Sequence, residues 1–289
     1  MSFAAFALIV LAAFIHASWN LLAKRAAQAG PVFVFFSTGV ACILYLPWLV
    51  WILLQGSIQW TSAGVLFIVA SGALHLAYSL CLQRGYQVAD LSVVYPIARG
   101  TGPMLSTMGA FLFLAESPSV SGIAGLLTIV AGILLISTQG RISRLLEPSA
   151  MTGVRWGTTT GTAIAAYTVV DAYAVKMLGV HAVVLDWCAN VVRMFMLLPW
   201  FVTHRKEAMP RMRGHWWLAI GVGALSPLSY ILVLFALQTG APLSLAAPAR
   251  EMSMMVGAFL GALILKETVG VWRLLGCLIM IIGVALLAR

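Results

Sequence analysis

Gly72-Ala73-Leu74 recurs 151 residues later as Gly223-Ala224-Leu225. Further identical residues keep this spacing in the two halves of the chain: Gln87 and Gln238, Arg99 and Arg250, Glu116 and Glu267, Gly125 and Gly276, Gly132 and Gly283, Leu135 and Leu286. Between them, Leu91-Ser92 and Pro96 match Leu243-Ser244 and Pro248 after a slip of one residue. A spacing kept through three predicted helices indicates an internal repeat of half the chain.

The composition places this repeat in a lipid bilayer. Charged residues make up 9% of the 289 residues, whereas 62% are hydrophobic. A soluble domain is about one quarter charged, so a soluble enzyme, a secreted module and a disordered protein are all excluded. The net charge of +9 does not indicate a nucleic-acid partner, because the basic residues fall mostly in short loops, where membrane topology accounts for them.

The apolar runs predict ten transmembrane helices, since each span takes about 20 residues. Their expected ranges are 2–23, 31–54, 61–85, 91–114, 119–137, 154–178, 182–203, 216–240, 243–265 and 270–288. Five spans are an odd number, so the second copy of the repeat enters the membrane in the opposite orientation. The predicted fold class is therefore all-α integral membrane, with ten helices as a 5+5 inverted repeat. Residues 1–138 form the first half, 139–153 a cytoplasmic linker and 154–289 the second half.

The loop charges predict the orientation in the membrane. One side collects twelve basic residues: Lys24, Arg25, Arg84, Arg141, Arg144, Arg155, Arg205, Lys206, Arg211, Arg213, Lys266 and Arg273. The other side holds only Lys176 and Arg289. By the positive-inside rule, the odd-numbered loops are expected in the cytoplasm and both termini outside. The expected location is the plasma membrane, the inner membrane of a bacterium.

Three sequence motifs resemble a known family. The first helix reads His16-Ala-Ser-Trp-Asn-Leu-Leu-Ala-Lys24. Each half then closes with a glutamate and a glycine-rich apolar helix, at Leu114-Ala-Glu116 and at Leu265-Lys-Glu267. In these features the chain resembles the EamA-like branch of the drug/metabolite transporter superfamily. The resemblance implies a carrier of small metabolites, often an exporter, with a cavity lined by helices 1, 3, 4, 6, 8 and 9 and with helices 5 and 10 at the periphery.

The chain departs from this pattern at one position. Small multidrug relatives carry a glutamate in their first helix, eight residues before a lysine. Here that spacing leads from Lys24 to His16 and from Lys176 to Thr168. Proton coupling through such a glutamate is therefore not expected.

Several ionisable residues fall at membrane depth, where a charge costs about 2.5–3.5 kcal/mol on insertion scales. Arg99 and Arg250 each follow an intramembrane proline, so they either hold an anionic substrate group through a bidentate contact or brace the fold against a carboxylate. Asp171 lies at the depth of Arg250. It either pairs with that arginine, or binds a substrate ammonium or a proton.

Polar and aromatic residues on the same helices complete the candidate site. His16 and His75 are expected near mid-membrane as titrating groups or as cavity walls, and Asn20 near Arg99. The aromatic residues either line the cavity or only pack. The predicted substrate-binding residues are His16, Trp19, Asn20, His75, Tyr78, Arg99, Tyr167, Asp171, Tyr230 and Arg250. Asn190 and Arg193 are predicted to be structural, and Glu116 and Glu267 to anchor loops. No catalytic residue, metal ligand or cofactor is predicted.

The predicted function is secondary transport of a small polar or zwitterionic metabolite, such as an amino acid or derivative. Export is implied by the resemblance alone. The sequence contains no Gly-x-x-x-x-Gly-Lys-Ser/Thr loop, so ATP is not expected to drive transport directly. The alternative is a flippase or an intramembrane enzyme that acts on a lipid-linked head group. The expected partners are the substrate and the lipid bilayer, with the chain a monomer or a homodimer.

Overall fold

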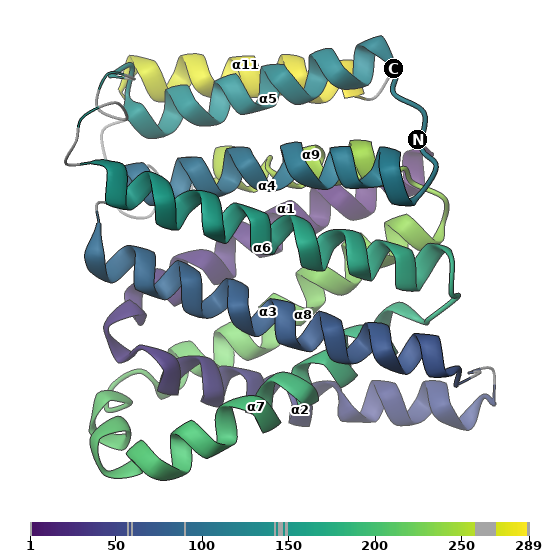
Figure 1. Cartoon of the computed structure of the whole chain (residues 1–289), viewed down its shortest axis with the longest axis vertical. Helices are drawn as coiled ribbons and strands as arrows, with labels where there is room; N and C mark the ends of the chain where they lie inside the picture. Colours follow the sequence, from purple (N-terminus) through teal and green to yellow (C-terminus); the bar gives the residue numbers. More distant parts are fainter. Residues whose placement is uncertain are drawn as a thin grey trace.

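The computed structural model describes residues 2–56, 58, 60–89, 91–141, 143, 147, 150–257 and 270–287, and every regular element among them is a helix (Figure 1). The elements are α1 (Phe3–Arg25), η1 (Ala27–Ala29), α2 (Pro31–Leu54), α3 (Ser62–Val88), α4 (Leu91–Phe113), α5 (Val120–Thr138), α6 (Met151–Lys176), α7 (Ala182–Arg211), α8 (Trp216–Gln238), α9 (Leu243–Arg250) and α11 (Val271–Leu287).

The predicted helix ranges agree with these bounds to within about three residues, with two exceptions. One exception is α7, which was expected to end at residue 203 and continues to Arg211. Its additional turns carry the exposed residues Arg205, Lys206 and Glu207, so the helix extends out of the apolar layer into water. The expected linker 139–153 is also slightly shorter, because α6 begins at Met151.

The second exception is the predicted ninth span, 243–265, which is not one continuous helix. α9 ends at Arg250, Glu251 and Met252 form a turn, and helical residues resume at 253–257; the rest of this span lies outside the described residues. Pro248 has no backbone N–H and fits at such an end. Broken helices are tolerated at membrane depth where neighbouring protein or a cavity satisfies the freed backbone groups. The break therefore places Arg250 and Glu251 where a polar site can form.

Six of the described helices are long and apolar enough to cross a membrane: α1, α2, α3, α5, α7 and α8. Their outer faces expose large apolar side chains, among them Ile43, Leu66, Phe195 and Trp217, each more than 60% exposed. Exposure of this kind suits contact with lipid. α4 and α6 carry prolines, threonines and charged residues and pack extensively against each other, and part of their polar content, such as Arg99, Thr107, Thr160 and Asp171, is buried inside the bundle.

The two halves of the chain make reciprocal contacts. The packing of α1 on α8 is matched by α3 on α6, and that of α2 on α8 by α3 on α7. Glycines matched by the repeat occupy the crossings. A methyl group at Gly72 would lie 2.8 Å from the carbonyl oxygen of Ala189, and one at Gly223 would lie 2.6 Å from that of Ser37. The repeated Gly-Ala-Leu segments therefore mark two equivalent close approaches between helices, as small residues do elsewhere in membranes.

α5 and α11 form a separate glycine-mediated pair at one end of the molecule, farthest from α2 and α7 (Figure 1). The glycines of each helix face the carbonyl oxygens of the other: Gly125 faces Gly283, and Gly132 faces Gly276. The expected peripheral position of the fifth and tenth helices agrees with this arrangement.

Substitution of Gly132 by alanine is expected to destabilise the fold. The added methyl group would lie 2.5 Å from Met280 Cγ and 2.8 Å from the carbonyl oxygen of Gly276, so the helices must separate. Overpacking of this kind costs about 1–3 kcal/mol, which lowers the thermal unfolding midpoint in detergent by several degrees. The control is Gly100→Ala, because a methyl group at Gly100 makes only an ordinary contact with Val130, at 3.6 Å. Equal midpoints for the two variants would contradict the tight α5–α11 contact.

Candidate functional site

A cavity of about 190 Å³ lies between the two halves of the chain. Its walls come from α1, α2, α3, α7 and α8, and α6 and α9 add one residue each, Tyr167 and Arg250. The lining runs along α1 from His16 to Ala23 and along α3 from Ser71 to Tyr86. The cavity therefore extends from mid-membrane toward the helix ends that carry Lys24, Arg25 and Arg84.

The expected set of lining helices is wrong in three respects. α4 contributes no described residue to the cavity, and α2 and α7, which were not expected there, supply a large part of its wall. The reason is the contact of α4 with α6. Methyl groups at Gly157 and Gly161 would lie 2.7 Å from Ile97 Cβ and Thr101 Cβ, respectively, so the two helices close on each other and leave no space between them.

Seven of the ten predicted site residues line this single cavity: His16, Trp19, His75, Tyr78, Tyr167, Tyr230 and Arg250. Their role in substrate binding remains a prediction. Asp171 and Arg99 are buried behind the wall, where they contact lining residues. Asn20 does not line the cavity. It was expected near Arg99, but the side chain from α1 that contacts Arg99 is His16, one turn earlier.

Arg99 is held by a carboxylate and an imidazole. Its Nη1 lies 3.2 Å from Glu251 Oε2, and both side chains are more than 90% buried. Its Nη2 donates to His16 Nε2 at 2.8 Å and also approaches Tyr95 Oη at 3.4 Å. Arginine has no acceptor, so His16 Nε2 must be the unprotonated ring nitrogen here. Of the two alternatives for Arg99, this geometry favours the one in which it braces the fold against a carboxylate.

Arg250 differs from its repeat counterpart. Its closest carboxylate is that of Glu251, with 4.0 Å between Nε and Oε1, and Glu251 is already engaged by Arg99. The Nε atom is buried and has no hydrogen-bond partner among the described residues. The side chain is 5% exposed, yet it lines the cavity. A buried guanidinium with an unused N–H donor on a cavity wall can donate hydrogen bonds to a planar anion.

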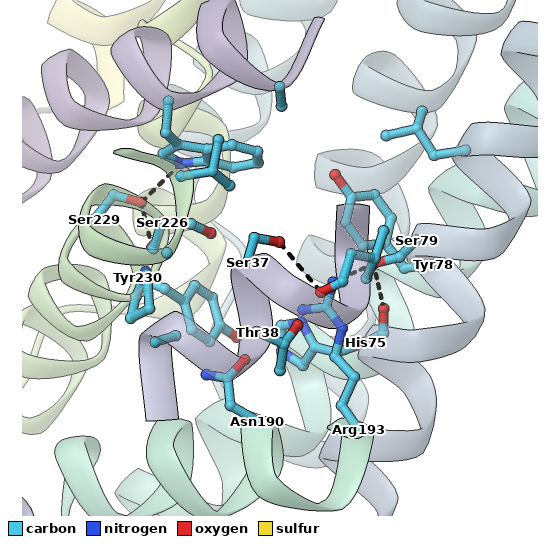
Figure 2. Close-up of a pocket in the computed structure, with 18 of the residues that line it drawn as sticks. Ser37, Thr38, His75, Tyr78, Ser79, Asn190, Arg193, Ser226, Ser229 and Tyr230 are labelled. Carbon is cyan, nitrogen blue, oxygen red and sulfur yellow. Dashed lines mark hydrogen bonds between the residues drawn. The ribbon is translucent and has the colours of Figure 1, made fainter. Parts of the chain in front are cut away.

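Among the described residues Asp171 does not pair with Arg250, and it lies behind the cavity wall. Its binding of a substrate ammonium or a proton stays a prediction. Its Oδ2 accepts hydrogen bonds from His75 Nε2 at 3.1 Å and from Tyr230 Oη at 2.5 Å. Both donors line the cavity wall (Figure 2), so the carboxylate lies directly behind it.

Polar residues of α2 and α7 were missed by the sequence analysis. They include Ser37, Thr38 and Asp186, with Asn190 and Arg193, for which only a structural role was predicted. Asn190 Nδ2 donates to Asp186 Oδ2 at 3.1 Å. Arg193 Nη2 donates to Ser79 Oγ at 2.9 Å, and both residues lie on the pocket wall in Figure 2. The spacing of 186, 190 and 193 places three polar residues on one helix face, and this signal could have identified α7 as a cavity wall.

On the opposite side of the bundle, Glu116 ties three helices together. It accepts hydrogen bonds from the backbone N–H groups of Leu243 and Ser244 at 2.7 and 2.9 Å. Lys176 Nζ lies 2.9 Å from its Oε1 and also donates to the carbonyl oxygen of Ala241. A carboxylate is favourable at a helix N-terminus. Glu116 thus joins the end of α4 to the start of α9 and the end of α6, which agrees with its predicted anchoring role; Glu267 lies outside the described residues.

The Glu116 contact is expected to make stability depend on pH. Burial raises the pKa of this carboxyl group, but the hydrogen bonds from Ser244, Leu243 and Lys176 outweigh it, and the pKa is lowered below 4.5. A group whose pKa is depressed by folding stabilises the protein above its unfolded pKa and loses that contribution as pH falls through the folded value. Glu116→Gln should therefore be less stable than wild type at neutral pH, and the difference in unfolding midpoint should shrink below about pH 4.5. A difference that stays constant with pH would contradict this role.

Comparison with known proteins gives two findings. A family model described as the EamA-like transporter family matches the chain twice, over residues 3–138 and 151–289. A solved structure, titled only "Crystal structure of protein", is similar over 98% of both chains, with a TM-score of 0.71 and 13% sequence identity. At this identity the likeness concerns the fold alone.

Proposed function

The chain belongs to the EamA-like transporter family, and on that basis we propose that this multi-pass membrane protein is a secondary transporter of a small polar or zwitterionic metabolite, such as an amino acid or derivative. Transport proceeds by alternating access of two inverted five-helix halves, residues 1–138 and 154–289. The double match of the family model and the reciprocal helix contacts support the repeat, and the odd number of spans in each half supports its inversion.

The observation that carries this proposal is the guanidinium of Arg250 on the wall of the mid-membrane cavity, whose buried Nε has no hydrogen-bond partner among the described residues. A cavity of about 190 Å³ suits a small metabolite rather than a large drug, because the pockets that bind drug-sized ligands measure about 300–1,000 Å³. Arg250 offers the donors for a carboxylate, and Asp186 and the hydroxyl groups of α2 offer acceptors for an ammonium. A zwitterion would thus find a partner for each end.

The orientation follows from loop charge. With the odd-numbered loops in the cytoplasm of a bacterial inner membrane, the cavity opens inward, because its lining extends toward the helix ends that carry Lys24, Arg25 and Arg84. The Glu116–Lys176 contact then lies on the outer side and holds it closed. Export is the direction that the family resemblance favours.

The test is a counterflow assay in proteoliposomes with a panel of radiolabelled amino acids, their derivatives and other small polar metabolites. At least one zwitterionic or carboxylate-bearing compound should exchange with a preloaded unlabelled pool, and neutral sugars should not. Protein-free liposomes give the background. Movement of a labelled phospholipid head group instead of any soluble metabolite would favour a flippase and overturn the proposal.

A further inference from the structure

The His75–Asp171 pair is the second polar centre of the cavity, distinct from Arg250. Asp171 is 1% exposed at its side chain and His75 is 19% exposed. His75 lines the cavity, whereas Asp171 lies behind it. Tyr230 approaches from α8 and donates to the same carboxylate oxygen as His75. Among the described residues, His75 is therefore the one imidazole that both lines the cavity and contacts this carboxylate.

Hydrogen bonding around the pair is incomplete. Asp171 Oδ1 is buried without a partner, as are Thr168 Oγ1 on the preceding turn of α6 and Ser71 Oγ on the preceding turn of α3. His75 uses Nε2 for Asp171, so its Nδ1 remains available on the cavity side. A buried polar atom without a partner is costly. Several such atoms around one carboxylate indicate a centre whose hydrogen bonding changes during function.

Acidic and basic residues both lie in this part of the bundle: Asp171, Asp186, Glu251, Arg99, Arg193 and Arg250. Tyr167 stacks on the imidazole ring with centroids 4.0 Å apart, and Tyr230 meets it edge-on at 5.2 Å. The titratable and charged groups around the pair come from every adjoining helix: Tyr78 (α3), Tyr167 (α6), Asp186 and Arg193 (α7), Tyr230 (α8), Arg250 (α9) and His16 (α1). Among the residues that the structure describes, Asp171 is the only carboxylate in contact with the imidazole.

We propose that His75 and Asp171 form a proton-binding site and that the proton is the coupling ion of the transporter. A proton from cavity water binds His75 at Nδ1, and the resulting imidazolium is neutralised by Asp171, which keeps its hydrogen bond from Nε2. No other co-reactant is required. This inference rests on the proposed function for its role in coupling, but binding of the proton does not depend on any transported metabolite.

Proton binding at this position can affect the packing of the two halves. α3 belongs to the first half, and α6 and α8 belong to the second. The His75–Asp171 contact joins α3 to α6, and Tyr230 joins α8 to the same oxygen. Proton occupancy therefore changes the strength of the polar contact between α3 and the second half, which is the boundary that must move during alternating access.

The first experiment counts protons on the purified full-length protein in nanodiscs. Potentiometric titration from about pH 8 to about pH 5, the range in which histidine charges, should show that His75→Gln binds one proton fewer than wild type. Asp171→Asn should also bind one fewer, and the double variant one fewer rather than two. Such non-additive counts mark a shared site. The matched control is His204→Gln combined with Asp171→Asn, because His204 is exposed on α7; this pair should lose two protons.

The outcomes separate the proton site from the transport proposal. If Asp171→Asn binds as many protons as wild type, or if the double variant loses two, the shared site is wrong, whatever the counterflow assay shows. If Asp171→Asn does not fold, the count for His75→Gln alone decides whether the imidazole titrates. If a transported metabolite is found, His75→Gln and Asp171→Asn should lose the accumulation driven by a pH gradient at least tenfold more than they lose counterflow. Accumulation equal to that of wild type would overturn the coupling role.

Discussion

Replacing Glu251 with alanine is expected to remove most of the yield of folded protein. The change leaves Arg99 and Arg250, both more than 90% buried, as like charges without a carboxylate. Breaking a buried ion pair by removing one partner costs about 3–5 kcal/mol, and the total stability of a protein is about 5–15 kcal/mol. The measurement is the yield of monodisperse protein in size-exclusion chromatography, together with the thermal unfolding midpoint.

Two companion variants test the reason for this loss. Glu207→Ala removes a carboxylate from the exposed end of α7 and should behave like wild type. Combining Glu251→Gln with Arg99→Met should recover most of the yield, because replacing both charges of a buried pair is often neutral for stability. If Glu251→Ala alone has the yield and midpoint of wild type, the buried charge cluster does not stabilise the fold.

Replacing Arg250 with glutamine is expected to abolish transport while the protein stays folded. The carboxylate nearest to Arg250 is that of Glu251, with 4.0 Å between Nε and Oε1, and Glu251 has a closer partner in Arg99. The removal of Arg250 therefore does not leave a carboxylate unpaired. Truncating one partner of a buried charged contact with a ligand costs about 2–5 kcal/mol, which corresponds to a loss in affinity of about 30-fold or more. Arg250→Lys should be intermediate, since it keeps the charge but lacks the planar fork.

The measurement is half-saturation in counterflow for the metabolite identified by the panel, with the unfolding midpoint as the check on folding. Arg84→Gln makes the same change of charge at an exposed position outside the cavity and should transport like wild type. Wild-type half-saturation in Arg250→Gln would remove this residue from the binding site. Arg193, which already donates to Ser79, would then be the next cation to test.

The candidate site was predicted in part, and the errors have a common cause. Burial of a polar residue at membrane depth can be read from the sequence, and this identified His16, His75, Asp171, Arg99 and Arg250. Which of them share a hydrogen bond cannot be read in the same way, because each contact joins helices that are far apart in the chain. For Asp171, a pair with Arg250 was one of two alternatives, and it rested on their similar depth alone. In the structure Asp171 contacts His75 and Tyr230 instead.

The sequence by itself determined the membrane class, the helices and the repeat, because hydropathy, loop charge and glycine spacing act locally along the chain. Nearly all helix ends follow from these signals, as does the family to which the chain belongs. Only the tertiary structure decided which helices enclose the cavity. The close contact of α6 glycines with α4 excludes α4 from the wall and leaves that position to α2 and α7. The break after Arg250 was not predicted although Pro248 precedes it, because the sequence does not show that Glu251 meets Arg99 of the other half at that depth.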